Sequence, residues 1–445
     1  MTPSEMLRLI PDYHEFLTLE ELHQSSVRLV DEFPRVARLE VIGTSTDGRP
    51  IELLTIGHGK RTVLFLGAPH PNEPIGVLTL EFLSRLLCER SDFREQLDCT
   101  FLIVKASDPD GLALNEGWFK GAFSPLTYAL NYYRPPQDEQ VEWGFPIHYK
   151  TLHFTTSPAE TQAVMRLMEQ YRPDFLYSLH NASFCGVYFY LSRHLPALFP
   201  QLHQLVADLG LPLHNGEPEV PYIQPWDRAI YPLFGAQEGY DFLEKNLGED
   251  PALYLSTGTS SDDYLKQLVP EAVSFICELP YFTDPMLEDV TLAGVSRREA
   301  MAEGMNRTEA TVRILETHFL ALRDRLPQNR LFRSVAEYLR RTPKRLVAQR
   351  NALAAPAYQQ EATRAQAFDA RVCRSFHCLL YLGELYRLAT AIGETARAAE
   401  MRTHIEDRMA QIETEGTIQI LPLRKLVAIQ AGSALLGLRG SLEIT

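Results

Sequence analysis

The chain has 445 residues, of which 45% are hydrophobic and 22% are charged, and these proportions are typical of a globular protein. No apolar run reaches the roughly 18–20 residues of a membrane span, and the first residues, MTPSEMLRLIPDYHEF, lack the basic start and apolar stretch of a secretion signal. The six cysteines are scattered without a CxxC pair, which argues against disulfides. We therefore expect no membrane partner and a cytoplasmic location.

The charge is distributed unevenly along the chain. Residues 291–445 carry 23 Lys and Arg against 16 Asp and Glu, so their net charge is +7; residues 1–290 carry −21, since the whole chain carries −14. An acidic first part is a poor partner for nucleic acid, because that binding neutralises phosphates with Lys and Arg. We expect no nucleic-acid partner. The opposite signs would suit docking of the two parts, although solvated faces of unrelated sign explain them too.

Residues 1–290 alternate between strand-like and helix-like segments. Thr18 and Glu21 form a predicted capping box before the helix LEELHQSSVRLVDEF. The predicted strands are RLEVIGTS, IELLTIGHG, VLFLG, CTFLIVKA, PDFLYSLHNA, GVYFYLS and AVSFICELPYF, and two further helices are IGVLTLEFLSRLLCER and PAETQAVMRLMEQY. This alternation predicts an α/β domain over residues 1–290, with a mostly parallel mixed sheet flanked by helices.

The pattern changes near residue 290, where strand signals nearly vanish. Long segments rich in Ala, Leu, Arg and Glu follow, such as ATVRILETHFLALRDRL. They predict an all-α domain over residues 291–445. No motif assigns it a role, so covering the active-site cleft, restricting substrate size and forming a homo-oligomer interface all stay open.

A histidine and a glutamate lie three residues apart directly after an apolar strand. In FLGAPHPNEP these are His70 and Glu73, and Pro71 and Pro74 argue against a helical HExxH site. A second strand, DFLYSLHNA, ends in His180. Sites in parallel α/β sheets lie beyond the carboxyl ends of strands, and two histidines with one carboxylate are a complete protein shell for catalytic zinc. The alternative is that His70 is an ordinary loop histidine and that His180 is a core histidine whose hydrogen bonds are made within the protein.

Glu278 is a single carboxylate inside the apolar run FICELPYF. Burying a carboxylate is costly unless it is paired or functional. At a strand end beside a metal it could accept a proton from water, since burial would raise its pKa and the charge of the metal would lower it again. A strand-end ion pair is the alternative.

Several motifs follow the order and approximate spacing of one known family. They are IGTSTDGRPI (residues 42–51) for IGxSxxGRxI, HPNE for HxxE, SDPDG (residues 107–111) for NPDG, SLH at the third ligand position, and TGTSSDDYLKQLVPEAVSFICELP for the GGSxDW segment and catalytic Glu. Over about residues 15–285 the chain thus resembles the zinc metallocarboxypeptidases of the carboxypeptidase A type. The resemblance implies one zinc ion on His70, Glu73 and His180, with Glu278 as general base and Tyr254 as the mobile substrate-binding tyrosine. It also implies a hydrolase that uses zinc-activated water to cleave a peptide or amide bond and release a C-terminal amino acid.

The substrate-binding residues depart from that family. Where the family has an oxyanion-stabilising Arg, NEGWFKGAF offers Lys120, which lacks the planar fork of Arg. The Asn of the family's carboxylate clamp corresponds to Asn131, but the Arg comes two residues late, as Arg134, and a clamp needs placement good to about 0.5 Å. Arg228 in QPWDRAIYP is a further candidate for substrate charge. The alternatives are a solvated surface lysine for Lys120, a surface or structural ion pair for Arg134 and a local ion pair for Arg228.

Two other hypotheses about function stay open. HPNE with LHN also resembles the HGNE and DLHN of the aspartoacylase and succinylglutamate desuccinylase branch, which cleaves N-acyl amino acids, so a zinc amidohydrolase or deacylase of small N-acyl substrates is the alternative. GTSxxGRPI and ELP favour the carboxypeptidase side. The third hypothesis is a silent scaffold whose helical domain binds a partner, although a dead site has no physical reason to keep four costly side chains.

Overall fold

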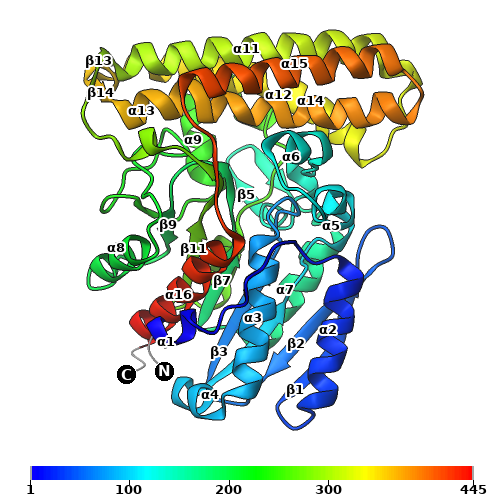
Figure 1. Ribbon diagram of the computed structural model, residues 1–445, viewed down its shortest axis with the longest axis vertical. Coiled ribbons are helices and arrows are strands. Elements are labelled where there is room, and N and C mark those ends of the chain that lie inside the picture. Colours follow the sequence, from blue (N-terminus) through cyan, green and yellow to red (C-terminus); the bar gives the residue numbers. More distant parts are fainter. Residues whose placement is uncertain (1–2, 443–445) are drawn as a thin grey trace.

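A computed structural model describes residues 3–442 and confirms the predicted fold class, an α/β sheet flanked by helices with a helical C-terminal part (Figure 1). The main sheet has eight strands. In spatial order they are β1 (Ala37–Thr44), β2 (Pro50–Ile56), β4 (Cys99–Val104), β3 (Arg61–Gly67), β7 (Phe175–Leu179), β11 (Val273–Glu278), β9 (Tyr188–Leu191) and β10 (Ile230–Pro232).

The centre of this sheet is parallel. β4, β3, β7 and β11 run in one direction as neighbours, whereas β1–β2, β2–β4 and β11–β9 are antiparallel pairs and β9–β10 is parallel. The carboxyl ends of β3, β7 and β11 therefore lie side by side at one edge of the sheet. That edge is where an α/β sheet places a binding site.

Both faces of the sheet are covered, so side chains of the central strands alternate between two cores. Along β3, Val63 and Phe65 face one core while Leu64 and Leu66 face the other. The helices over the first core include α2 (Leu19–Glu32), α3 (Ile75–Glu89), α4 (Ser91–Leu97) and α16 (Leu423–Leu442), and those over the second are α7 (Ala159–Tyr171) and α10 (Ser261–Leu268). Burial on both sides explains why β3 and β7 read as continuous apolar runs.

Two local predictions at the N-terminal side are confirmed. The Thr18 hydroxyl accepts from the backbone N–H of Glu21 at 3.3 Å, and the Glu21 carboxylate accepts from the backbone N–H of Thr18 at 2.8 Å, which is the predicted capping box of α2. The segment from His70 to Pro74 is not helical, and α3 begins only at Ile75.

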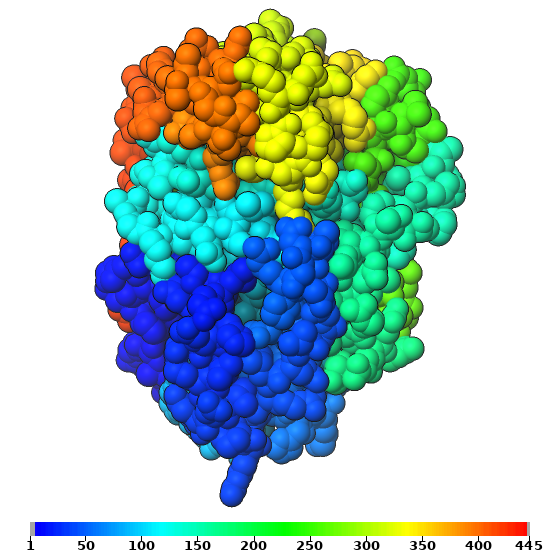
Figure 2. All heavy atoms as spheres, turned by 90° about the vertical axis from the view of Figure 1, so that its right-hand side faces the viewer, coloured from blue at the N-terminus to red at the C-terminus, as the bar shows by residue number. Residues whose placement is uncertain are grey.

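The helical part forms a layer over the site edge of the sheet, at the top of Figure 1. Its helices are α11 (Arg297–Leu322), α12 (Arg330–Ala352), α13 (Arg364–Phe368), α14 (Arg374–Ala391) and α15 (Thr395–Glu415). Figure 2 shows the yellow and orange helices of this layer packed directly against the cyan segments beneath them. We call α11 to α15 the helical layer.

The last helix leaves the helical layer and returns to the sheet. After α15 the chain pairs β15 (Gln419–Ile420) with β12 (Pro280–Thr283), and α16 then packs against α3, α8 (Phe199–Asp208), β7 and β11. The first helix, α1 (Pro3–Leu7), packs against α16, so the first and last described helices lie side by side (Figure 1). The chain after residue 290 therefore contributes to both parts of the molecule, and the division near residue 290 stays a prediction.

The remaining elements are short. They are α5 (Pro109–Asn115), α6 (Pro125–Asn131), α9 (Ala236–Leu247), β5 (Ile147–Tyr149), β6 (Leu152–Phe154), β8 (Ala182–Phe184), β13 (Leu292–Ser296), β14 (Glu361–Thr363) and several single turns of 3-10 or π helix. All six cysteines are buried and free. Within residues 3–442, no helix combines the length and the apolar character that crossing a membrane requires.

Ion pairs join the helical layer to the α/β part, with the basic partner always on the helical layer. They include Arg330 with Asp47 (2.9 Å) and Asp110 (2.8 Å), Arg333 with Glu139 (2.5 Å), Arg297 with Glu217 (2.6 Å) and Lys344 with Glu249 (3.1 Å). Asp110 also binds Ser45 and Arg49, so the GTSTDGRPI and SDPDG motifs meet at this contact. The opposite net charges of the two parts favour this docking.

Candidate metal centre and cavity

Three neighbouring parallel strands end at the candidate site. The loop after β3 carries His70 and Glu73, His180 directly follows β7, and Glu278 is the last residue of β11. Because these strands are adjacent, side chains from distant parts of the sequence meet at one edge of the sheet.

Two local features shape the loop that carries His70 and Glu73. Ala68, the first residue after β3, is fully buried with a φ of 46°, a conformation that is uncommon outside glycine. At the start of α3, a Cβ on Gly76 would lie 2.6 Å from the Cβ of Leu179, so only glycine lets α3 approach the end of β7 this closely. The close approach brings Glu73 against His180.

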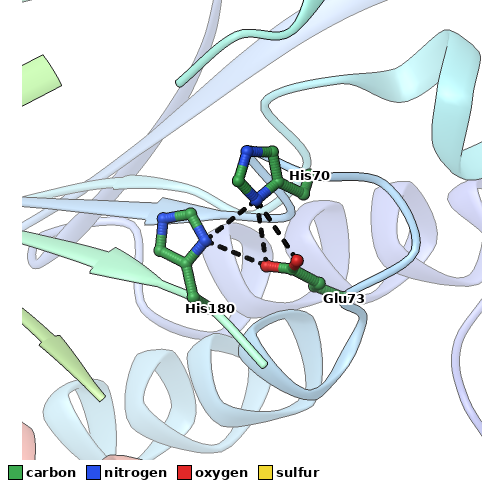
Figure 3. A group of neighbouring side chains, drawn as sticks. All are labelled: His70, Glu73 and His180. Carbon is green, nitrogen blue, oxygen red and sulfur yellow. Dashed lines mark hydrogen bonds and ion pairs between the residues drawn. The ribbon is translucent and has the colours of Figure 1, made fainter. Parts of the chain in front are cut away.

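The side chains of His70, Glu73 and His180 point toward one another (Figure 3). Nδ1 of His180 lies 3.1 Å from Nδ1 of His70 and 2.9 Å from Oε2 of Glu73, and Nδ1 of His70 lies 3.2 Å from Oε1 of Glu73. All three side chains are buried, and their candidate ligand atoms lie within 4.8 Å of one another. Two imidazole nitrogens and one carboxylate fit a transition metal such as zinc.

The other face of His180 is oriented by a carboxylate that sequence reasoning missed. Nε2 of His180 lies 2.9 Å from the hydroxyl of Ser178 and 3.5 Å from Oε2 of Glu142. Glu142 also accepts hydrogen bonds from the hydroxyls of Ser178 (2.7 Å) and Ser261 (2.6 Å). A carboxylate behind a metal-ligating histidine commonly fixes its ring orientation. The sequence signal that could have identified Glu142 is the same as for Glu278: a single carboxylate among apolar residues, here in VEWGF.

The backbone of His180 is held from the far end of the chain. Gln430 on α16 donates from Nε2 to the carbonyl of His180 at 2.7 Å and accepts from the hydroxyl of Thr79 on α3 at 2.9 Å. All three residues are buried. The last helix therefore helps to position a candidate ligand, which no pattern in its sequence indicated.

The charges at the three side chains suit replacement of a proton by a metal. Burial alone would raise the pKa of Glu73, but the two histidines hold it far below its usual range. Burial and then the charge of Arg134 lower the pKa of His70 to about 4. Burial would also lower the pKa of His180, but hydrogen bonds with Glu142 and Glu73 raise it well above the usual value. Because metal ligands must be deprotonated, a metal ion bound here would displace the proton that these contacts stabilise on His180.

Glu278 lines the same cavity as the two histidines, and its side chain forms no hydrogen bond or ion pair with any residue from 3 to 442. Burial, and then the charge of Glu73, raise the pKa of the Glu278 carboxyl well above its usual range. Its carboxyl group is thus free to meet a ligand.

A cavity of about 500 Å³ extends from the candidate metal centre to the helical layer. Its floor contains His70, Glu73, His180 and Glu278, and we call these four residues the floor. Its opposite wall, which we call the roof, comes from the helical layer; the roof residues include Met301, Met305, Tyr338, Arg341, Lys344, Arg345, Arg374, His377 and Tyr381. The volume is that of a site for a small ligand.

Two of the sequence-proposed substrate-binding residues line this cavity. Arg134 donates to Glu73 at 3.0 Å, and its backbone N–H donates to Glu384 of α14 at 3.0 Å. The hydroxyl of Tyr254 donates to Glu249, and the ammonium of Lys344 lies 4.7 Å from the centre of its ring.

The other three are not among the residues that line the cavity. Lys120 lies on the surface and pairs with Glu21 at 2.8 Å. The side-chain amide of Asn131 donates to the carbonyl of Thr127 within its own helix at 3.0 Å. The exposed Arg228 donates to Asn215 at 2.6 Å.

Together, the fold and the donor set define an α/β protein with a candidate two-histidine, one-carboxylate metal centre at the strand ends. Residues 22–210 match the family model described as zinc carboxypeptidase, peptidase family M14. This match confirms, over residues 22–210, the resemblance that the sequence motifs indicate. No curated protein sequence matches the chain.

Solved carboxypeptidase structures are similar at low identity. Carboxypeptidase A from Helicoverpa armigera is 15% identical with a TM-score of 0.40, covering 60% of this chain and 65% of its own. A metallo-carboxypeptidase from Burkholderia cenocepacia is 17% identical with a TM-score of 0.36, covering 59% and 60%. Bovine thrombin-activatable fibrinolysis inhibitor, in complex with tick carboxypeptidase inhibitor, is 12% identical with a TM-score of 0.36, covering 76% and 97%. The chain thus spans less than two thirds of the first two of these proteins.

Proposed function

We propose that the protein is a zinc-dependent hydrolase that cleaves a peptide or amide bond and releases a C-terminal amino acid. The observation that carries the proposal is the meeting of His70, Glu73 and His180 at neighbouring strand ends, with the free carboxyl of Glu278 on the same cavity. The match of residues 22–210 to the zinc carboxypeptidase family supports it.

In this proposal His70, Glu73 and His180 hold one zinc ion. When bound there, zinc would supply Lewis acidity at the scissile carbonyl and acidify water. Glu278 is the general base, which takes a proton from the attacking water and delivers it to the leaving nitrogen. Glu142 orients His180 through its second ring nitrogen. Tyr254 contacts the substrate from the cavity wall.

The helical layer forms one wall of the cavity, and in this proposal it restricts the size of the substrate. The alternative reaction, removal of the acyl group from a small N-acyl amino acid, uses the same residues and fits the same cavity. Both substrates are amides of an amino acid, so the two proposals differ in what lies on the acyl side of the scissile bond. Homo-oligomer formation through the helical layer stays a prediction.

A substrate panel tests the proposal. Protein loaded with zinc is expected to hydrolyse blocked dipeptides that have a free carboxylate, to lose this activity with excess chelator and to regain it when zinc is restored. Preference for N-acyl amino acids would favour the deacylase, and equal cleavage of C-terminally amidated peptides would rule out selection for a free C-terminus. Amide hydrolysis that survives complete removal of the metal would contradict the zinc mechanism.

A further inference from the structure

Five of the described residues that line the cavity have basic Lys or Arg side chains, and four of these five lie in the roof. Four of the five are already engaged in ion pairs within the protein. These pairs are Arg134–Glu73 (3.0 Å), Lys344–Glu249 (3.1 Å), Arg374–Asp369 (3.1 Å) and Arg341–Glu337 (3.3 Å).

The side chain of the fifth, Arg345 on α12, forms no ion pair or hydrogen bond with any residue from 3 to 442. Its surface is open to the cavity, yet the surrounding protein removes enough solvent to lower its pKa, and the nearby charge of Arg341 lowers it further. Glu219 attracts it electrostatically without pairing with it, and that carboxylate accepts from the hydroxyl of Tyr190 at 2.9 Å. Arg345 is therefore a guanidinium with unused donors in a partly desolvated place.

A second unengaged side chain, that of His377 on α14, lines the same cavity. It forms no hydrogen bond with the described residues and packs edge-on against Tyr381. The charges of Arg134 and Glu73 near the floor and of Arg345 and Arg341 in the roof all act on it. Its burial and these arginines lower its pKa to about 3, so it is a neutral imidazole that can donate one hydrogen bond.

The floor side of the cavity has no comparable cation. Arg134, the basic side chain nearest the candidate ligands, is bound to Glu73, while Lys120 and Arg228 do not line the cavity. Arg345 thus supplies the unpaired positive charge of the cavity, and an anionic group of a substrate that enters the cavity can bind there.

We infer that Arg345 binds a free carboxylate of the substrate, with His377 as a second donor, so that the helical layer and not the α/β part recognises the acid. The inference rests on the proposed hydrolase function, and it specifies the substrate as a small peptide or N-acyl amino acid with a free carboxylate. A planar guanidinium can hold a carboxylate through two parallel hydrogen bonds, which lysine cannot do.

Calorimetric titration tests this inference, and every zinc-loaded sample carries Glu278→Gln, which removes the proposed general base and so suppresses hydrolysis of the probes. The probes are N-acetyl leucine, phenylalanine, glutamate and lysine, each as free acid and as amide. For the preferred probe, Arg345→Gln is expected to weaken binding of the acid about 10- to 100-fold and to leave binding of the amide unchanged. Arg345→Lys is expected to recover part of the loss.

The matched control is Arg350→Gln, a change on the same helix outside the cavity, where Arg350 pairs with Glu309. It is expected to bind acid and amide as the wild type does. The inference is overturned if Arg345→Gln binds the acid as tightly as before, or if it weakens binding of the acid and of the amide equally. It is also overturned if the protein with Arg345 intact binds none of the acids more tightly than the corresponding amide. Zinc content is measured on every sample, so an absence of zinc identifies failure of the proposed function itself.

Discussion

The floor and the roof of the cavity differ in how the sequence specifies them. Each floor residue lies at or just after the end of a strand, and parallel strands bring such residues to one edge whatever their separation in sequence. Roof residues such as Arg345 and His377 lie within long helices, where only docking decides which side faces the cavity. Catalytic residues at strand ends can therefore be inferred from the sequence, whereas substrate-binding residues on a docked helical layer cannot.

A polar contact joins the helical layer to the floor side of the cavity. The backbone N–H of Arg134, on the floor side, donates to the buried carboxyl of Glu384 on α14. The same arginine binds Glu73 through its side chain. The helical layer thereby helps to position a residue next to the candidate metal centre. The following variants separate what each region contributes.

The largest effect is expected on the floor, from Glu278→Gln. Removing the general base should lower kcat about 10²- to 10⁴-fold, because the amide cannot accept the proton from water. Zinc content should be unchanged, since Glu278 is outside the proposed ligand set. Steady-state kinetics with metal analysis check both statements, and a kcat within tenfold of wild type would assign the base to another residue.

Glu142→Gln should have the next largest effect, about 10- to 100-fold in zinc affinity or activity, because the carboxylate that orients His180 is lost. Competition with a chromogenic chelator measures the affinity. Glu139→Gln is the matched control in a nearby turn, where the carboxylate pairs with Arg333 and not with the floor. Equal losses in both variants would show that the effect is not specific to His180.

Glu384→Gln tests the contact between the two regions through pH. Burial raises the pKa of Glu384 from 4.5 to about 8, so the folded protein binds this proton more tightly than the unfolded chain does. The wild type should therefore lose stability as the pH rises from about 4.5 to 8, by at most about 1.4 kcal/mol per pH unit, and the variant should not. Denaturant unfolding at pH 5 and pH 8 measures the free energy of unfolding of both proteins. If the difference between variant and wild type is the same at both pH values, the raised pKa of Glu384 is excluded as a source of pH-dependent stability.

The smallest effect is expected from Lys120→Ala. Lys120 pairs with Glu21 at the surface, so kcat/KM should be unchanged and the free energy of unfolding should stay within about 0.5 kcal/mol. A tenfold fall in kcat at unchanged zinc content would instead restore Lys120 as an oxyanion-stabilising residue.

Much of the α/β part could be predicted from the sequence, for particular physical reasons. The apolar run at residues 63–67 is typical of a doubly covered strand, and Pro71 and Pro74 keep the following loop out of a helix. The pairing of His70 and Glu73 with His180 follows from those two facts together with the parallel order of the strands.

The rest could not be predicted, because it depends on contacts between distant segments. Gln430 lies in an apolar helix with ordinary core periodicity, and only its packing on α3 and β7 brings it to the carbonyl of His180. Lys120 and Arg228 have the right charge for a substrate site, but their local partners keep them at the surface. Arg345 is one of several arginines on α12, and the sequence does not indicate which of them faces the cavity.

Anomalous diffraction at the zinc absorption edge, from crystals of the zinc-loaded protein, tests the central claim most directly. We predict one anomalous peak per chain, bounded by Nδ1 of His70, Nδ1 of His180 and the carboxylate of Glu73, and its loss in crystals of His180→Ala. A strong peak elsewhere, or none at these three side chains in the wild type, would contradict the account.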